Sequence, residues 1–288
     1  MFRLSKHCFL LYNTLQKGSV KMENRYASRI EKVQMSSIRV VMEKVEKLRS
    51  QGKSVVSLCA GEPDFNTPEG IKKATIEALN DNQTHYSSNR GYLGLRKKVA
   101  HLLKEQTTID YDSDTEIIMT CGCSEAINNV CQAFINKDDE VIIFTPAFVS
   151  YQNTVLLCQG IPVEIPLKLS LGFQIDIEEV KNKITKKTKM IILNNPNNPT
   201  GAVYQKETLE QLCKLARENN ILILADEIYN QLDYENQYVS IASFENMKDY
   251  TIIVNGFSKA YAMTGWRMGY IASSQKHIDQ ILKVHQYT

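Results

Sequence analysis

The chain has 288 residues, of which 43% are hydrophobic and 23% are charged, and its formal net charge is +2. A chain of this length can bury about three quarters of the surface that its unfolded form exposes, so a core needs no disulfide or metal to stabilise it. The near-balanced charge predicts no nucleic-acid partner. The sequence has no run of about 18 consecutive apolar residues, so we expect no membrane-spanning helix and no membrane partner.

Residues 1–22 form a basic leader, because Glu23 is the first acidic residue of the chain. Such a leader resembles a mitochondrial presequence, and a disordered tail ahead of a start at Met22 is the alternative that we favour. The seven cysteines are scattered and odd in number, which is typical of reduced thiols inside a cell. We therefore expect a cytoplasmic location, or a mitochondrial one if the leader is a presequence, and no metal site.

The first part of the chain shows mostly helical periodicity. Apolar residues at helical spacing predict amphipathic helices over 28–50, 71–79, 95–103 and 126–135. Thr67 and Pro68 precede the second of these as an N-cap followed by proline at the first helical position. Ser54–Cys59, with the sequence SVVSLC, predicts a short strand between the first two helices.

From residue 116 onward, short β-rich runs alternate with helical stretches. The runs lie at 116–120, 140–144, 190–193, 221–225 and 251–254, and a predicted helix over 207–219 separates two of them. Strands that alternate with helices predict crossover connections, and therefore a mainly parallel sheet flanked by helices. The run Ile221–Leu224 is apolar at every position, which is typical of a strand buried on both faces.

Three of these predicted strands end in unusual residues. The first leads into Asp226, the second into the loop Asn194–Gly201, which is rich in Asn and Pro, and the third is followed by Lys259. Taken singly, Asp226 could be a helix N-cap, the loop a stack of turns and Lys259 a surface lysine. Ligands in open parallel sheets bind beyond the carboxyl ends of the strands, so the three together indicate a candidate site.

Five ordered motifs resemble those of the class I/II pyridoxal-phosphate aminotransferases, the fold-type-I family related to aspartate aminotransferase. They are Gly61–Phe65 (GEPDF), Tyr86 with Gly91–Arg96 (GYLGLR), Asn195–Gly201 (NPNNPTG), Asp226–Tyr229 (DEIY) and Gly256–Lys259 (GFSK) with Arg267 and Gly269 in register. The match extends over about residues 24–288. The resemblance implies an α/β fold with a mainly parallel central sheet, a large cofactor-binding domain over 66–288, and an N-terminal arm with part of a small domain over 23–65.

The resemblance also implies roles around the ring of pyridoxal 5'-phosphate. Lys259 is expected to bind the cofactor aldehyde covalently and to act as general base once freed. Asp226 is expected to keep the pyridine nitrogen protonated, which makes the ring an electron sink. Tyr229 and Asn198 are expected to hydrogen-bond the phenolic oxygen, and Phe148, which by itself could be an ordinary core residue, to stack on the ring.

The cofactor phosphate is expected at the start of the helix that follows Gly122. The residues implied in its binding are Cys123 and Ser124 through their backbone N–H groups, Ser258 and Arg267 in the same chain, and Tyr86 from the neighbouring subunit. The last of these requires a homodimer with a shared active site. Gly256 stands where some family members have a phosphate-binding serine, and the bonds Thr145–Pro146 and Asn198–Pro199 match positions that are often cis in the family.

The implied activity is transfer of an amino group from an L-amino acid to a 2-oxo acid by a ping-pong mechanism, with Gly61 and Asn198 as substrate contacts. Ser124 replaces a lysine of one bacterial aspartate branch, which favours broad or aromatic substrates over strict aspartate. Family members are longer, so we expect the rest of the small domain, with the arginine that grips the substrate α-carboxylate, to be missing. A carbon–sulfur β-lyase of the same fold and a truncated cofactor-binding protein without efficient turnover are the alternatives.

Overall fold

A computed structural model of the chain describes residues 26–288, and the predicted leader over residues 1–22 lies outside this range. Contacts divide the chain into two compact units, Met1–Gln34 and Met35–Thr288. The described part of the first unit contains a short 3-10 helix, η1 (Ser28–Lys32). The second unit contains the sheet and the candidate site.

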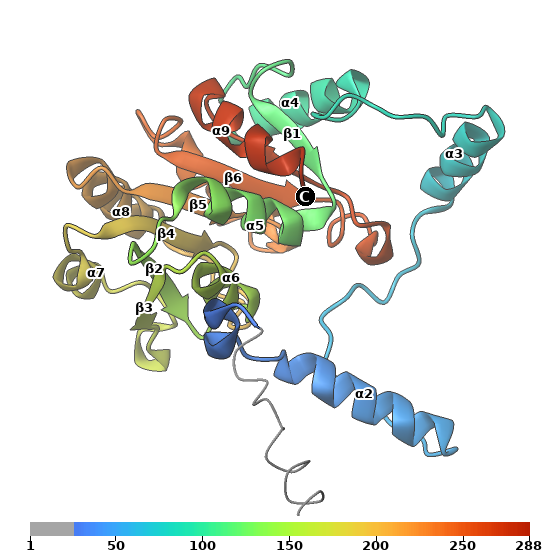
Figure 1. Ribbon diagram of the computed structural model, residues 1–288, viewed down its shortest axis with the longest axis horizontal. Helices are drawn as coiled ribbons and strands as arrows, with labels where there is room; N and C mark the ends of the chain where they lie inside the picture. Colours follow the sequence, from blue (N-terminus) through green and yellow to red (C-terminus); the bar gives the residue numbers. More distant parts are fainter. Residues whose placement is uncertain (1–25) are drawn as a thin grey trace, which may run out of the picture. The chain divides into compact units, whose positions relative to one another are not determined.

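The described residues form one sheet of seven strands in the order β1-β7-β6-β5-β4-β2-β3 (Figure 1). In chain order they are β1 (Ile117–Thr120), β2 (Glu140–Thr145), β3 (Ile161–Pro166), β4 (Thr188–Asn194), β5 (Leu222–Asp226), β6 (Thr251–Gly256) and β7 (Gly269–Ala272). The expectation of a mainly parallel sheet is confirmed, because six of these strands run in one direction and β7 alone runs opposite to them.

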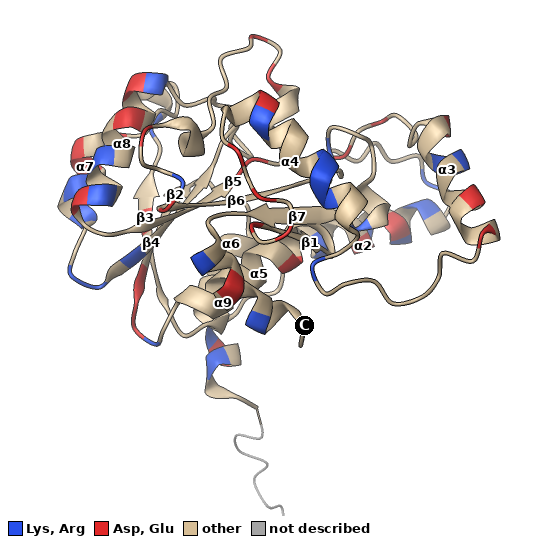
Figure 2. Ribbon diagram, turned by 90° about the horizontal axis from the view of Figure 1, so that it is seen from above, with Lys and Arg blue, Asp and Glu red and all other residues tan. Residues whose placement is uncertain are grey.

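Helices cover both faces of the sheet, with α5, α6 and α9 on one side and α4, α7 and α8 on the other (Figure 2). Their bounds are α4 (Leu93–Thr107), α5 (Gly122–Phe134), α6 (Ser150–Leu157), α7 (Ile177–Lys183), α8 (Lys206–Glu218) and α9 (Gln275–His285). Side chains of β4 alternate between the hydrophobic cores on the two faces of the sheet. Met190 and Ile192 pack with α5 on one face, and Ile191 and Leu193 pack with α8 on the other. Among the described residues, no helix combines the length and the apolar character needed to cross a bilayer.

Two strands of the sheet were not expected from the sequence. β3 contains prolines at 162 and 166, which a strand tolerates at an edge, and β3 pairs with β2 alone. β7 has only four residues and begins at Gly269, so it lacks a β-rich run of its own. The five predicted strands and the predicted helices at α3 (Glu69–Asn80), α4, α5 and α8 are confirmed.

The predicted elements before residue 67 are corrected by the structure. The pattern over 28–50 is two separate helices, the short η1 and α2 (Ser37–Ser50), rather than one. Ser54–Cys59 forms no strand. Val56 and Leu58 are 87% and 93% exposed there, and no described segment pairs with this stretch, as a strand would require.

Thr67 is not the N-cap of the following helix, contrary to the prediction. The helix α3 begins at Glu69 after Pro68, and no side chain caps it. The Thr67 hydroxyl instead donates to the carbonyl oxygen of Ala262 at 2.6 Å and accepts a hydrogen bond from Nε1 of Trp266 at 2.9 Å. These contacts hold the chain before α3 to the segment that follows Lys259.

Candidate active site

Three neighbouring parallel strands bring their carboxyl ends to one edge of the sheet. Asn194 at the end of β4 pairs in register with Asp226 at the end of β5, and Asp226 pairs in turn with Val254 of β6. The chain leaves β6 at Gly256 and reaches Lys259 three residues later. The three unusual strand ends seen in the sequence are therefore adjacent in space.

Asp226 is a buried carboxyl group, only 4% exposed. The hydroxyl of Tyr151 donates to its Oδ2 at 2.6 Å, and the backbone N–H of Ile228 donates to its Oδ1 at 3.3 Å. Burial raises the pKa of Asp226 to about 6, and the two hydrogen bonds oppose that rise. Desolvation makes a cationic partner strongly favourable for this carboxylate.

Asn194 connects the loop after β4 to the end of β5. Its Nδ2 donates to the carbonyl oxygen of Asp226 at 3.0 Å, and its Oδ1 accepts from the backbone N–H of Asn198 at 2.7 Å. The Asn198 side chain then donates through Nδ2 to the Tyr229 hydroxyl at 3.0 Å. Burial and the charge of Asp226 raise the pKa of Tyr229, so the phenol stays protonated. The two residues predicted to share one oxygen of a ligand are hydrogen-bonded to each other.

Lys259 lies beside this group with its amine half-buried. Its Nζ donates to the carbonyl oxygen of Gly61 and lies 5.7 Å from the centroid of the Tyr229 ring. Burial lowers the pKa of Lys259, and the charge of Arg267 acts in the same direction, while Glu62 opposes them. A lowered pKa increases the fraction of neutral amine, which is the nucleophilic form.

The start of α5 forms an anion-binding geometry with Arg267. Gly122 begins this helix at a φ of +75°, and a Cβ on it would lie 2.6 Å from Nη2 of Arg267. A Cβ on Gly269 would lie 2.9 Å from the backbone nitrogen of Cys123. Both glycines therefore allow the guanidinium and the start of β7 to approach the first turn, whose N–H groups carry the positive end of the helix dipole.

Several charged groups of the site influence the thiol of Cys123. Burial raises the pKa of its thiol, the charge of Asp226 raises it further, and Arg267 and Lys259 lower it. Its Sγ lies 3.3 Å from where a Cβ on Gly256 would stand. A Cβ at 256 would also lie 2.7 Å from the carbonyl oxygen of Met268, so this chain has no room for a serine at this position.

The other predicted site residues are placed as follows. Ser258 is buried, Ser124 is exposed at the start of α5, and Tyr86 is fully exposed on the loop before α4. Phe148 is half-buried and packs edge-to-face on Tyr151, with ring centroids 5.7 Å apart. The bonds Thr145–Pro146 and Asn198–Pro199 are both cis, as expected, and Asn195–Pro196 is cis as well.

Two residues of the site were missed in the sequence. Tyr151 lies three residues after Phe148, and this helical spacing could have indicated that both side chains face the same way. Asn194 is the last residue of β4, where the rule that ligands bind beyond strand ends could have distinguished it from the rest of its loop.

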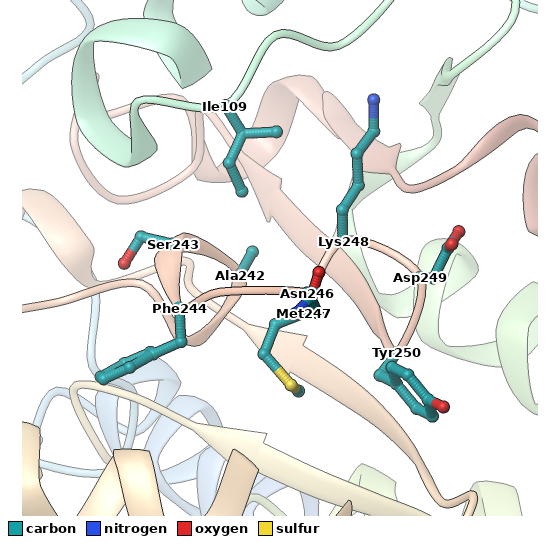
Figure 3. A pocket seen from close by; sticks show the side chains of 9 residues that line it. All are labelled: Ile109, Ala242, Ser243, Phe244, Asn246, Met247, Lys248, Asp249 and Tyr250. Atoms are coloured by element: carbon teal, nitrogen blue, oxygen red, sulfur yellow. The ribbon is translucent and has the colours of Figure 1, made fainter. Parts of the chain in front are cut away.

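A separate cavity of about 420 Å³ lies at the other end of β6 (Figure 3). Its lining includes Ile109, Lys248 and Tyr250, and the last of these directly precedes the first residue of the strand. It is therefore distinct from the group around Lys259, which follows the carboxyl end of the same strand.

Comparisons with known proteins agree with this geometry. Residues 53–287 match the family described as aminotransferase class I and II. The aspartate aminotransferase of Pyrococcus abyssi is 42% identical over 236 residues, which are 82% of this chain and 61% of that protein. The aromatic-amino-acid aminotransferase 2 of Thermococcus litoralis is 40% identical over 262 residues, covering 91% of this chain and 66% of the relative.

Solved structures show the same fold. The aspartate aminotransferase of Thermus thermophilus with maleate has a TM-score of 0.88 at 38% identity and covers 92% of this chain and 69% of its own. The aromatic aminotransferase of Pyrococcus horikoshii has a TM-score of 0.79 at 41% identity, with 84% and 66% covered. The fold prediction is thereby confirmed.

The chain spans about three fifths to two thirds of the length of the curated relatives it matches. Class I and II aminotransferases use pyridoxal 5'-phosphate as their cofactor. The family match covers most of the chain, and the relative from Pyrococcus abyssi is 42% identical over 82% of it. This chain is a member of the aminotransferase class I and II family.

Proposed function

We propose that this chain binds pyridoxal 5'-phosphate at the edge formed by β4, β5 and β6, and that the protein transfers an amino group from an L-amino acid to a 2-oxo acid. One observation carries the proposal. The buried carboxyl of Asp226 ends β5, the amine of Lys259 lies 5.7 Å from the centroid of the Tyr229 ring, and Arg267 lies against Gly122 at the start of α5, so an acid, an amine and an anion-binding group gather at one edge of the sheet.

The residues present fit the chemistry of that cofactor. The Asp226 carboxylate would meet the cationic ring nitrogen, which supplies the partner that its burial favours. The phenol of Tyr229 and the amide of Asn198, already hydrogen-bonded to each other, would bind the phenolic oxygen. Phe148 would cover a ring face. When bound, the cofactor supplies an electron sink for the substrate carbon that loses its proton.

Lys259 would perform the proton transfers. Its amine would hold the cofactor aldehyde covalently until the substrate amine displaces it. The free Nζ would then act as the base that takes the proton from the substrate α-carbon. Burial supports this role because it lowers the pKa of Lys259 and so keeps part of the amine neutral. Tyr151 would act through Asp226, whose carboxylate it holds at 2.6 Å.

The phosphate would be held at the first turn of α5. The backbone N–H groups of Cys123 and Ser124 would donate to it, with the Ser258 hydroxyl and the Arg267 guanidinium beside them. The close packing of Gly122 against Arg267 supports this assignment, because the guanidinium reaches the helix start only where a side chain is absent. Gly61, whose carbonyl oxygen contacts Lys259, and Asn198 would contact the substrate.

We favour a broad or aromatic substrate range over strict aspartate. The relatives include both an aspartate and an aromatic-amino-acid aminotransferase, so membership of the family does not distinguish between the two substrate ranges. Ser124 supports the broad range, because its short neutral side chain offers no charge to a second carboxylate. The proposed domain division is an arm and partial small domain over 23–65 and a cofactor-binding domain over 66–288.

We further propose a homodimer in a cytoplasmic location. The exposed Tyr86 supports a shared active site, because within its own chain its side chain is fully accessible. The cysteines of the described range are free thiols, which supports a reducing compartment.

The test is cofactor capture by Lys259. Wild-type protein incubated with pyridoxal phosphate should develop a visible absorbance band that survives gel filtration, and an amino acid should bleach that band while releasing the matching 2-oxo acid. Lys259→Ala should develop no such band, whereas Lys214→Ala, which changes a lysine exposed on α8, should match wild type. An unchanged band in Lys259→Ala would remove the lysine from its proposed role. Release of pyruvate and ammonia instead would favour a β-lyase.

A further inference from the structure

His285, at the end of α9, links that helix to the start of α5. Its Nδ1 lies 2.6 Å from Oε1 of Glu125, and its Nε2 lies 2.8 Å from the carbonyl oxygen of Asn89. A neutral imidazole has one N–H group and can donate to only one acceptor. Because a carboxylate and a backbone carbonyl can only accept, both contacts are satisfied together only when the ring is doubly protonated.

Glu125 extends this contact to the first turn of α5. Its Oε2 accepts the backbone N–H of Cys121, the residue directly before the helix, and its Oε1 also accepts from Nδ2 of Asn129 at 2.8 Å. The side chains of Glu125 and His285 are only 15% and 17% exposed, so water screens their interaction weakly. The carboxylate therefore lies at the start of α5, in the turn proposed to receive the phosphate.

We propose that His285 is a positioning residue for this phosphate site, and that its protonated ring holds Glu125 and the Asn89 segment against the first turn of α5. The inference rests on the proposed cofactor binding at that turn. When the ring loses a proton, one of its two acceptors loses its donor. The charge of Glu125 is then no longer neutralised and repels a phosphate dianion at the same helix end.

The charged groups around His285 leave Glu125 as its main partner. On the Asn89 loop, Arg90 is paired at 3.1 Å with Asp279 of α9. On its own helix, Lys283 bonds Gln280. These groups therefore have partners of their own and do not replace the contact between the ring and Glu125.

The direction of the pH dependence follows from this pair. The hydrogen bond to Glu125 raises the pKa of His285, although burial opposes it. For Glu125, burial raises the pKa, and the hydrogen bonds from His285, Cys121 and Asn129 outweigh burial and lower it. Because the pKa of His285 is raised, the contribution of its protonated ring is fully present at low pH and is lost as the pH rises through that pKa. Cofactor affinity should therefore have a component that declines as His285 deprotonates.

The experiment measures the dissociation constant of pyridoxal phosphate by absorbance titration from about pH 6 to about pH 9 in four proteins. Relative to wild type, His285→Gln should bind pyridoxal phosphate about three- to tenfold more weakly at the acid end of this range. Its affinity should no longer show the decline with rising pH that comes from His285. His285→Arg should restore binding and keep it flat, because a guanidinium donates to two acceptors at any of these pH values. His101→Gln, which removes an exposed histidine of α4, is the matched control.

A second readout does not depend on the cofactor. In the NMR spectrum, the ring proton of His285 should titrate above the ordinary value of about 6.5, and Glu125→Gln should lower that midpoint. A midpoint at or below 6.5, a wild-type pH profile in His285→Gln, or no restoration by His285→Arg would each overturn the inference. If wild type itself takes up no cofactor, the proposed function fails and this inference with it, whereas normal wild-type binding with an unaltered His285→Gln defeats this inference alone.

Discussion

At the scale of single residues, two adjacent buried carboxyls at the end of β5 have different surroundings. Asp226 accepts the hydroxyl of Tyr151 from α6, whereas Glu227 accepts the hydroxyl of Ser240 at 2.6 Å from the segment that leads into β6. Burial raises the pKa of Glu227 to about 7, and the Ser240 hydrogen bond opposes that rise. Neighbouring residues at a strand end point to opposite faces, so one carboxyl faces the candidate site and the other stabilises the fold around it.

Tyr151→Phe tests whether the hydrogen bond from the Tyr151 hydroxyl sets the pKa of Asp226. The hydroxyl lowers the pKa of Asp226, so its loss should raise the pKa above the value of about 6 in the cofactor-free protein. At neutral pH a smaller fraction of the Asp226 carboxyl would then be ionised and able to pair with the ring nitrogen of the cofactor. Because a hydrogen bond to a charged group contributes about 1.5–3 kcal/mol, cofactor affinity should fall by about tenfold or more.

The measurement for Tyr151→Phe is a carbon NMR titration of the Asp226 carboxyl, together with the dissociation constant of pyridoxal phosphate. Tyr234→Phe, at an exposed tyrosine in the loop after β5, should leave both unchanged. An Asp226 midpoint that does not move in Tyr151→Phe would show that the hydroxyl has no influence on the carboxyl.

At the scale of elements, Arg267 can approach the start of α5 because the first residue of that helix, Gly122, has no side chain. Gly122 has a positive φ, which glycine adopts without strain, and Arg267 occupies the space that a side chain would need. Gly269 of β7 allows the neighbouring backbone to approach in the same way. A helix start, a strand start and an arginine thus meet because of glycines that are distant in the sequence.

Gly122→Ala should weaken phosphate and cofactor binding. The added Cβ would lie 2.6 Å from Nη2 of Arg267 and displace the guanidinium from the helix start. Backbone strain at positive φ should also reduce the free energy of unfolding by about 1–2 kcal/mol. Gly172→Ala is a matched control, because Gly172 also has a positive φ, of +59°, but no neighbour within 4 Å of its Cβ position.

Thermal denaturation and the dissociation constants of inorganic phosphate and pyridoxal phosphate would separate the two effects. Both alanine variants should lose similar stability, while only Gly122→Ala should bind more weakly, by about tenfold, as expected for losing a charged hydrogen-bond donor. Equal binding in the two variants would mean that the position of Arg267 does not matter for anion binding.

At the scale of the whole molecule, the sequence predicts the elements whose burial shows in their own apolar pattern and misses those that are fixed by contacts with distant segments. The apolar run of β5 and the amphipathic α8 carry their burial in their composition, and both were predicted. Ser54–Cys59 has the composition of a strand but no partner strand among the described residues, so composition alone misled. In the site, Lys259, Asp226 and Asn198 belong to motifs, whereas Tyr151 joins them through a hydrogen bond to a residue 75 positions away, and its spacing from Phe148 is the one local sign of where its side chain lies.

Tyr86 provides a test at this scale, because its expected role crosses the boundary of the chain. It is fully exposed on a loop that hydrogen-bonds β1 through the carbonyl oxygen of Arg90 and the N–H of Met119 at 3.0 Å. If its hydroxyl reaches the phosphate of the partner subunit, Tyr86→Phe should weaken cofactor retention by about three- to tenfold in the dimer, as for loss of one hydrogen bond. Tyr92→Phe, at another exposed tyrosine nearby, should have no such effect.

Hybrid dimers separate a contact across subunits from one within a chain. One subunit carries Tyr86→Phe, the other carries Lys259→Ala, and two different affinity tags allow the hybrid to be purified. If Tyr86 serves the partner, the lysine of the first subunit meets the intact tyrosine of the second, and that site binds the cofactor with wild-type affinity. If Tyr86 serves its own chain, the only site with a lysine lacks its tyrosine and binds as weakly as the Tyr86→Phe homodimer. The affinity of that single site therefore decides whether the active site is shared.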